Sequence, residues 1–415
     1  MPHEYHGWMS PTRSAELHDA VHEAFERWQV PLLAELVEQP SATREVEDVE
    51  HVMARLDREA SALGLSVETI APGAEEVSSH RLYATPACEA DTTALLLVGH
   101  ADTVFPRAMG FFGFRREGEA ARGPGVLDMK SGLTSMFASL RALKAVNEAA
   151  FQALKLRIVV VSDEEIGSPS SQALYTRLAP HTSSALVFEA GRVHDHIVTS
   201  RKGSGLFRLR ALGRAAHAGN KHHAGANAIH ALAAAVLRVE SLTDYERGLT
   251  VNVGTIEGGS AKNTVPESAE IGIDVRFTHT DDVARFRDAL EAIAEAPFEG
   301  IDARWTNERA LSVRIELSGN VSRPPMQASL ASQALRVAYE KHAAAQGLGV
   351  GEAPLQGGGS DGNLLAALGV PSIDGLGPFG EYFHERREWC SLTSLSQRTA
   401  ALATFLAEEA GGPSR

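Results

Sequence analysis

Cysteine is scarce in this 415-residue chain, which contains only Cys88 and Cys390. Two cysteines exclude a disulfide framework and a cysteine-rich zinc site. Basic residues are also fewer than acidic ones. The chain contains 39 lysines and arginines and 53 aspartates and glutamates, which gives a net charge of −14. General nucleic-acid binding needs a basic footprint, so this function class is excluded. An anionic substrate is compatible with the balance, because local arginines can reverse the field inside a cleft.

Long apolar runs are missing as well, and no uncharged segment reaches the length that spans a membrane. The N-terminal residues 1–6 do not combine a basic segment with a following apolar one, so a signal peptide is not predicted. The remaining composition, with 44% hydrophobic residues, is typical of a globular protein long enough for two domains. We therefore expect a cytoplasmic enzyme that works without a nucleic acid or a membrane.

The first 200 residues alternate between short apolar runs and helical patterns. Apolar runs without polar alternation are typical of strands that are buried on both faces of a parallel sheet. The predicted strands cover 65–70, 81–84, 94–98, 154–162 and 185–188, and the predicted helices cover 14–38, 45–63, 133–143 and 168–179. This rhythm predicts an α/β catalytic domain with a mostly parallel central sheet flanked by helices.

The pattern changes near residue 200. Residues 271–277 alternate between apolar and polar side chains, which indicates a sheet with one covered and one exposed face. We read residues 200–321 as an inserted, smaller α+β sandwich domain that serves as a dimerisation and lid domain. The catalytic metallohydrolase domain then takes residues 1–199 and 322–415.

A polar cluster follows the apolar run 94–98 directly, in the stretch Gly99–Pro106. Open α/β sheets bind ligands at the carboxyl ends of their strands. His100 can bind a metal ion through one ring nitrogen, and Asp102 can hold the other N–H, as a carboxylate usually does. If this pair is considered alone, the alternative is that His100 only ends a strand and Asp102 is a turn or cap residue.

Further oxygen and imidazole donors stand at predicted strand ends or in loops. The full set is His100, Asp128, Glu165, Glu189 and His384. Such a set suits Zn²⁺ in an open catalytic site, or Co²⁺ or Mn²⁺. Five ligands are too many for one tetrahedral zinc with a vacant position, but they fit two ions that share a bridging carboxylate. Glu164, next to Glu165, is free to take a proton from a metal-bound water.

Several motifs together resemble the di-zinc exopeptidases of the glutamate carboxypeptidase type, the carboxypeptidase G type. Acetylornithine deacetylase, succinyl-diaminopimelate desuccinylase and the aminoacylases belong to the same superfamily. The motifs are His100-Ala101-Asp102-Thr103-Val104, Gly123-Pro124-Gly125, Asp128-Met129-Lys130-Ser131-Gly132, Asp163-Glu164-Glu165-Ile166-Gly167-Ser168 and Glu189. They occur in the family's order within a resemblance that runs from about Leu36 to Leu395.

The resemblance implies a role for each residue of the centre. Asp128 would bridge two Zn²⁺ ions, with His100 and Glu189 completing one site. Glu165 and His384 would complete the other site. Glu164 would be the general base and later the acid, Asp102 would orient His100, and the peptide bond between Asp128 and Met129 would be cis.

The inserted segment also resembles the family. His217, in Gly213-Arg214-Ala215-Ala216-His217-Ala218-Gly219, would reach the partner subunit's site and stabilise the oxyanion. Asn263, Arg276, Arg323, Gly358 and Gly359 would bind substrate, with Arg323 on its α-carboxylate. Two departures stand out: Ala190 follows Glu189 where many members have proline, and His384 is followed by Glu385-Arg386-Arg387-Glu388 in place of the common Ser-x-x-Glu. The resemblance then implies Glu388 as the partner that holds His384.

The resulting prediction is a metal-dependent hydrolase that cleaves an amide bond next to a free carboxylate. The expected substrate is a small peptide or an N-acyl amino acid, from which C-terminal glutamate is removed. An N-acyl-amino-acid deacylase with the same machinery is the first alternative. A catalytically silent binding scaffold is the second, and the intact Glu164 argues against it. We expect a homodimer.

Overall fold

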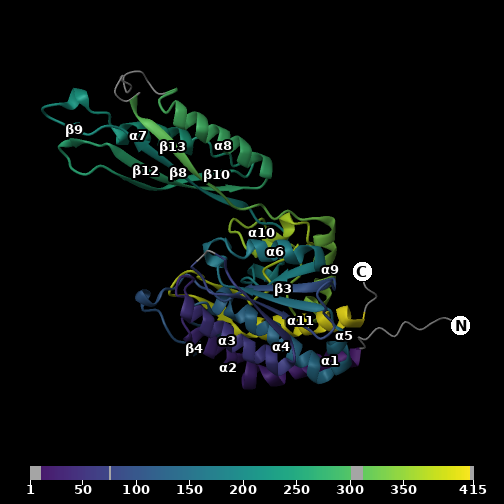
Figure 1. Ribbon diagram of the computed structural model, residues 1–415. Helices are drawn as coiled ribbons and strands as arrows, with labels where there is room; N and C mark the ends of the chain where they lie inside the picture. The colour runs from purple at the N-terminus through teal and green to yellow at the C-terminus, as the bar shows by residue number, and fades with distance from the viewer. Residues whose placement is uncertain (1–10, 74–75, 301–311, 412–415) are drawn as a thin grey trace. The chain divides into compact units, whose positions relative to one another are not determined.

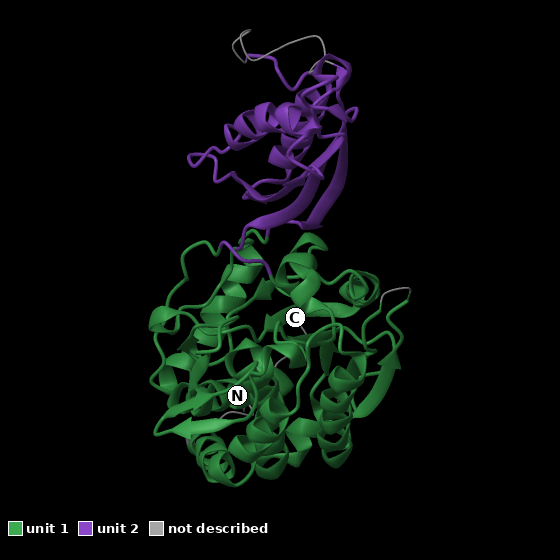
Figure 2. Cartoon of the chain, turned by 90° about the vertical axis from the view of Figure 1, so that its left-hand side faces the viewer, with its two compact units in different colours: residues 1–200, 326–356, 360–415 green, residues 201–325, 357–359 purple. Residues whose placement is uncertain are grey.

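The computed structural model describes residues 11–73, 76–300 and 312–411, so the expectation about residues 1–6 lies outside the described part. The chain divides into two compact units (Figure 2). Unit 1 takes the residues up to 200, 326–356 and those from 360 onward, and unit 2 takes residues 201–325 and 357–359. Unit 2 therefore extends past the predicted boundary at residue 321. The reason is a strand, β13 (Arg314–Arg323), which pairs with unit 2 as far as Arg323.

Unit 1 is built on a six-stranded sheet with the order β1-β2-β6-β3-β7-β14. The strand β3 pairs in parallel with β6 and β7, and β14 pairs in parallel with β7. The strands β1 and β2 are antiparallel. The bounds are β1 Ser66–Ile70, β2 His80–Ala84, β3 Ala94–His100, β6 Leu156–Val161, β7 Thr182–Val187 and β14 Ser372–Ile373. The prediction of a mostly parallel central sheet is confirmed.

Both faces of this sheet are buried, which explains the uninterrupted apolar runs. Leu95 and Leu97 belong to one core cluster, together with residues of α3, α4 and α11. Leu96 and Val98 point the other way, into a second cluster with residues of α6 and α10. Because successive side chains of a strand point to opposite faces, the positions of β3 before its last residue must be apolar or small. The layered arrangement of helices around β3 can be followed in Figure 1.

The four helices predicted for the first 200 residues are present in unit 1, and the first of them is interrupted. A π-helical turn, Phe25–Gln29, separates α1 from α2, and the Val30 N–H bonds to the Phe25 carbonyl. Pro31 follows at the start of α2, where a missing N–H is tolerated. The bounds are α1 Pro11–Ala24, α2 Val30–Glu38, α3 Val46–Leu63, α4 Ser131–Val146, α5 Glu148–Ala153, α6 Gln172–Leu178, α9 Leu330–Ala345, α10 Asp361–Ala367 and α11 Leu392–Gly411.

Unit 2 is an antiparallel sheet covered on one face by two helices. The strand order is β10-β12-β8-β13, with bounds β8 Gly203–Leu212, β10 Thr250–Gly258 and β12 Ser268–Phe277. The helices are α7 (Ala228–Glu240) and α8 (Thr280–Glu295). Alternate residues such as Ile271 and Ile273 are buried with the helices in one core, and their neighbours are more exposed. The predicted smaller α+β fold is confirmed.

Two minor sheets complete the described residues. In unit 2, β9 (Ala216–His217) pairs with β11 (Thr264–Val265). In unit 1 a small antiparallel sheet has the order β15-β16-β5-β4, with bounds β4 Arg115–Glu117, β5 Ala120–Arg122, β15 Gly380–Glu381 and β16 Trp389–Ser391. No helix in the described part of the chain is both long and apolar enough to cross a membrane.

Candidate metal centre

The predicted ligands stand at one edge of the unit 1 sheet. His100 is the last residue of β3. Glu165 lies four residues after the end of β6, and Glu189 lies two residues after the end of β7. Since β3, β6 and β7 are parallel, their carboxyl ends meet at the same edge. The sheet topology therefore brings together side chains that are far apart in the sequence.

Asp128 occupies the middle of the cluster. Its Oδ1 atom lies 3.2 Å from His100 Nε2, and its Oδ2 atom lies 3.2 Å from His384 Nε2. The remaining carboxylates flank the histidines: Glu189 Oε1 is 3.8 Å from His100 Nε2, and Glu165 Oε2 is 3.2 Å from His384 Nε2. The structure thus brings all five predicted ligands together around Asp128.

The loop that carries Asp128 is held by a buried carboxylate whose role sequence reasoning missed. Glu388 is fully buried, and its Oε1 accepts hydrogen bonds from the amides of Leu127 and Asp128 at 2.7 and 3.0 Å. Its Oε2 accepts one from the amide of Gly125 at 3.0 Å. Glu388 was expected to hold His384, but these hydrogen bonds instead fix the loop that carries Asp128. The peptide bond between Asp128 and Met129 is cis, as the resemblance implied.

Asp102 fixes both the first histidine and the acidic pair. Its carbonyl oxygen lies 2.9 Å and its Oδ1 atom 3.3 Å from His100 Nδ1, so the Nε2 atom is left to face Asp128. The Asp102 carboxylate also accepts hydrogen bonds from the amides of Glu164 and Glu165, at 3.3 and 3.2 Å, and from Thr43 Oγ1 at 2.7 Å. One fully buried carboxylate therefore positions residues from two neighbouring strand ends.

The electrostatics of the cluster favour the binding of cations. Burial and the nearby Asp128 charge raise the pKa of Glu165 to about 8, and the same two causes raise the pKa of Glu189. Hydrogen bonds to Asp128 and Glu165 raise the pKa of His384 to about 10. Carboxylates this close repel one another unless a positive charge lies between them.

The residues present fit a pair of divalent cations. Asp128 offers one oxygen to each histidine, as a bridging carboxylate would. Glu165 Oε1 is buried and has no hydrogen-bond partner among the described residues, which suits an atom that awaits a ligand. The donors are oxygen and imidazole nitrogen, the types that zinc, cobalt and manganese accept.

Glu164 lies beside the ligands and is itself largely buried, with 8% of its surface exposed. Its carboxylate, His100 and Glu189 each offer an atom within 4.8 Å of the others. The short helix Glu164–Ile166 that carries it is fixed from behind by Asp163, whose Oδ2 accepts hydrogen bonds from the amides of Ser170 and Ser171 at 2.7 and 3.2 Å. An acid at this position can exchange a proton with a group bound at the centre.

The substrate-binding residues implied by the resemblance lie in unit 2. His217 and Asn263 come together at the β9–β11 ladder, where the Ala218 amide bonds to the Asn263 carbonyl at 2.9 Å. His217 Nδ1 accepts hydrogen bonds from the amides of Gly219 and Asn220 at 3.1 and 3.0 Å, so its Nε2 atom is the one turned to other groups.

The two predicted arginines meet at the other end of the unit 2 sheet. Arg276 and Arg323 both pair with Ser204, from opposite sides of β8. Arg276 is held by two hydrogen bonds of 2.9 Å to Asp274, and Arg323 is only 6% exposed. The glycine loop lies in the same unit, because Arg201 Nη1 donates to the Gly358 carbonyl at 3.0 Å, and Gly359 follows.

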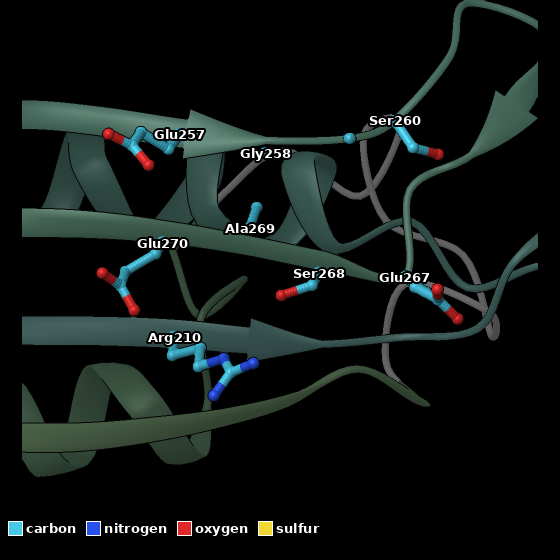
Figure 3. Close-up of a pocket in the computed structure, with 9 residues that line it drawn as sticks. Arg210, Glu257, Gly258, Ser260, Glu267, Ser268, Ala269 and Glu270 are labelled. Carbon is cyan, nitrogen blue, oxygen red and sulfur yellow. The ribbon is translucent and has the colours of Figure 1, made fainter.

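A hollow of about 370 Å³ lies elsewhere in unit 2, at the far end of β8, β10 and β12 (Figure 3). It contains none of the predicted site residues. Its lining is polar and mainly acidic, with Glu257, Glu267 and Glu270 around Arg210. We assign it no role in the chemistry of the centre.

A cluster of carboxylates and imidazoles at the carboxyl edge of a parallel sheet, with a further acid beside it, defines a metal-dependent hydrolase. The comparisons with known proteins agree with this class. Residues 199–302 match the family model of the M20 peptidase dimerisation domain. Carboxypeptidase G2 from Pseudomonas sp. strain RS-16 is 27% identical over 324 residues, which cover 77% of this chain and 74% of that protein.

Solved structures share the fold across nearly the whole chain. The aminopeptidase PepT from Bacillus cereus ATCC 10987 has a TM-score of 0.75 at 22% identity, covering 93% of this chain and 99% of that one. The M20 family metallo-carboxypeptidase Sso-CP2 from Sulfolobus solfataricus has a TM-score of 0.70 at 16% identity, covering 92% of this chain and 99% of that one. The chain is thus similar to M20 peptidases in its fold and, over residues 199–302, in its sequence.

Proposed function

We propose that this protein hydrolyses the amide bond next to a free C-terminal carboxylate, and that it removes glutamate from small peptides or N-acyl conjugates. The observation that carries the proposal is the arrangement around Asp128. One oxygen of Asp128 faces His100 and the other faces His384, and a second carboxylate lies beside each histidine. The likeness to carboxypeptidase G2 supports release from the C-terminal end.

Two Zn²⁺ ions per chain are the proposed cofactors, with Co²⁺ or Mn²⁺ as substitutes. His100 and Glu189 hold one ion, Glu165 and His384 hold the other, and Asp128 bridges them. When bound, the ions polarise the scissile carbonyl and lower the pKa of a water molecule. Asp102 and Glu388 act behind the ligands, where they keep His100 and Asp128 in place.

Glu164 is the proposed general base and acid. Its carboxylate takes a proton from the attacking water and afterwards gives it to the nitrogen of the leaving amine. The hydrogen bond from the Glu164 amide to Asp102 Oδ1, at 3.3 Å, fixes the backbone at Glu164 relative to the residue that also holds His100. This role requires that the Glu164 carboxylate keeps an oxygen that is not bound to metal, because only such an oxygen can accept the proton.

The substrate is held by unit 2 residues in this proposal. Arg323 takes the α-carboxylate, because a planar guanidinium matches a carboxylate with two parallel hydrogen bonds. Arg276, Asn263 and the glycine loop contribute further contacts, and His217 donates a hydrogen bond from Nε2 to the oxyanion. Arg276 is preorganised for such a role by its pair of bonds to Asp274.

The active form is proposed to be a homodimer in which His217 serves the partner's site. The match to a peptidase dimerisation domain supports this assembly. In the described sheet of unit 2, β10 and β13 are the edge strands, and their unpaired backbone groups can be covered by a second copy.

A substrate panel tests the proposal. The protein is loaded with Zn²⁺ or Co²⁺ and assayed against dipeptides and N-acyl amino acids that end in glutamate, in a neutral residue or in an amidated residue. We expect hydrolysis that requires the free carboxylate and prefers glutamate. Preference for N-acyl groups with no selection for glutamate would indicate the deacylase instead. No turnover of any member would indicate the silent scaffold.

A further inference from the structure

A buried histidine lies at the same sheet edge as the metal ligands, although the proposed reaction does not use it. His80 is the first residue of β2 and is only 1% exposed. Because β2 runs antiparallel to β6, its first residue lies at the carboxyl end of β6, from which the turn with Glu164 and Glu165 emerges. A buried polar ring is costly unless its nitrogens are hydrogen-bonded, so the contacts of His80 show what it holds.

The hydrogen bonds of His80 fix which ring nitrogen carries the proton. Nδ1 accepts a hydrogen bond from the Ser162 amide at 3.3 Å, and the Ser162 hydroxyl donates to the Ser78 carbonyl at 2.6 Å. Burial lowers the pKa of His80, so the ring is neutral and its one N–H is at Nε2. Nε2 therefore donates to Ser170 Oγ, at 2.8 Å.

Ser170 connects this histidine to a buried carboxylate. The Ser170 hydroxyl donates to Asp163 Oδ2 at 2.9 Å, and the Ser170 amide donates to the same atom at 2.7 Å. Asp163 is fully buried, and within the described chain its Oδ1 atom has no hydrogen-bond partner. The charge of Asp163 is thus held through Oδ2, and Ser170 supplies two of the three hydrogen bonds that Oδ2 accepts from described residues.

Asp163 closes the turn that carries the acidic pair. Its carbonyl accepts a hydrogen bond from the Ser168 amide at 2.8 Å, and Ser168 has a φ angle of 60°, in the left-handed region that side chains rarely adopt. Such a backbone persists only where surrounding contacts hold it. Glu164 and Glu165 lie between these two residues in the sequence, so the direction of their side chains depends on how firmly Asp163 is held.

We infer that His80 is a positioning residue for the centre, because it fixes the turn that carries Glu164 and Glu165. It acts through Ser170 and Asp163. This inference rests on the proposed function and adds one residue to it. The donors point in one direction, from the ring to the carboxylate, so only a donor at the position of Nε2 can replace the histidine. A histidine that merely filled space would be replaceable by any side chain of similar size.

Two replacements of His80 separate the roles of its two ring nitrogens. Glutamine reaches the position of Nε2 and can donate to Ser170, whereas the shorter asparagine reaches only the position of Nδ1 and can accept from Ser162. In His80→Asn we expect kcat on the glutamate substrates, and Zn²⁺ affinity from chelator competition, to fall about tenfold with little change in KM. In His80→Gln both quantities should stay within about twofold of wild type. Thr176→Ala, which removes an exposed hydroxyl from α6, is the control and should change neither.

Ser170→Ala tests the same link from its other end and leaves the histidine in place. The loss should again be about tenfold, and adding His80→Asn should cost at most about a further twofold, because the link is already broken. Losses that multiply to about a hundredfold would overturn the inference. So would an equal loss in His80→Gln, or a His80→Asn variant with both quantities within twofold of wild type.

If the wild-type enzyme hydrolyses none of the glutamate substrates, the proposed function fails, and Zn²⁺ affinity alone then judges His80. A tenfold weaker affinity in His80→Asn, restored in His80→Gln, would still support the positioning role. Equal affinity in the wild-type protein and the two variants would refute it.

Discussion

Replacing Glu388 by glutamine should loosen the loop that carries Asp128. The carboxamide oxygen can keep the two bonds that Oε1 accepts from Leu127 and Asp128. The amide nitrogen, however, replaces Oε2 and turns a donor towards the Gly125 N–H. One buried hydrogen bond is lost and two buried donors, the Gly125 N–H and the new amide N–H, are left facing each other, at a cost of about 1–3 kcal/mol of unfolding free energy for each unsatisfied group.

The same change should weaken metal binding, because residues behind the ligands typically account for about 10–100-fold in metal affinity. Urea unfolding gives the stability difference, and competition with a chromophoric chelator gives the affinity. Glu381→Gln, an exposed neighbour in the same segment, is the matched control and should change neither quantity. Glu388→Gln with unchanged stability and an affinity within twofold of wild type would refute the positioning role.

Three further predictions concern the catalytic groups. Glu164→Gln should keep its metal content, but its kcat should fall about 10²–10⁴-fold because a carboxamide cannot accept the proton. Metal analysis and steady-state kinetics measure the two quantities. Glu165→Gln should instead lose metal affinity in the chelator assay, with activity partly recovered at high metal concentration. The Glu164→Gln and His217→Ala variants can be mixed under conditions that allow subunit exchange. If His217 acts in the partner's site, activity should recover towards half of the wild-type value. If activity does not recover, His217 acts in the site of its own subunit.

Patterns of neighbouring residues predicted most of the helices and strands, because burial of one or both faces of an element is recorded in its own sequence. The alternation over residues 271–277 predicted most of the strand β12, and the apolar run of β3 indicated its burial on both faces. The helix α11 was missed, although it packs in the main core, because buried polar residues such as Arg398 and Thr399 blur its apolar stripe. The extent of β13 was also missed, since its pairing with β8 depends on residues about a hundred positions away.

The site was predictable to the extent that strand ends define it. His100, Glu165 and Glu189 follow buried strands, and parallel topology places their side chains at one edge. His384 follows no such strand and was a candidate only as a histidine in a loop, and its grouping with Glu165 came from the family resemblance. The true contacts of Glu388 are with backbone amides more than 250 positions away in the sequence, at separations of 260 to 263 residues, and backbone amides leave no signal in the sequence.

The central claim is that Asp128 joins two metal ions in one catalytic centre, and metal titration tests it most directly. Protein stripped with a chelator and reloaded is analysed for bound metal and for hydrolysis in parallel. The account predicts two divalent ions per chain, with activity lost on stripping and regained as the ions return. Full activity in the stripped protein, or saturation at a single ion with full activity, would contradict it.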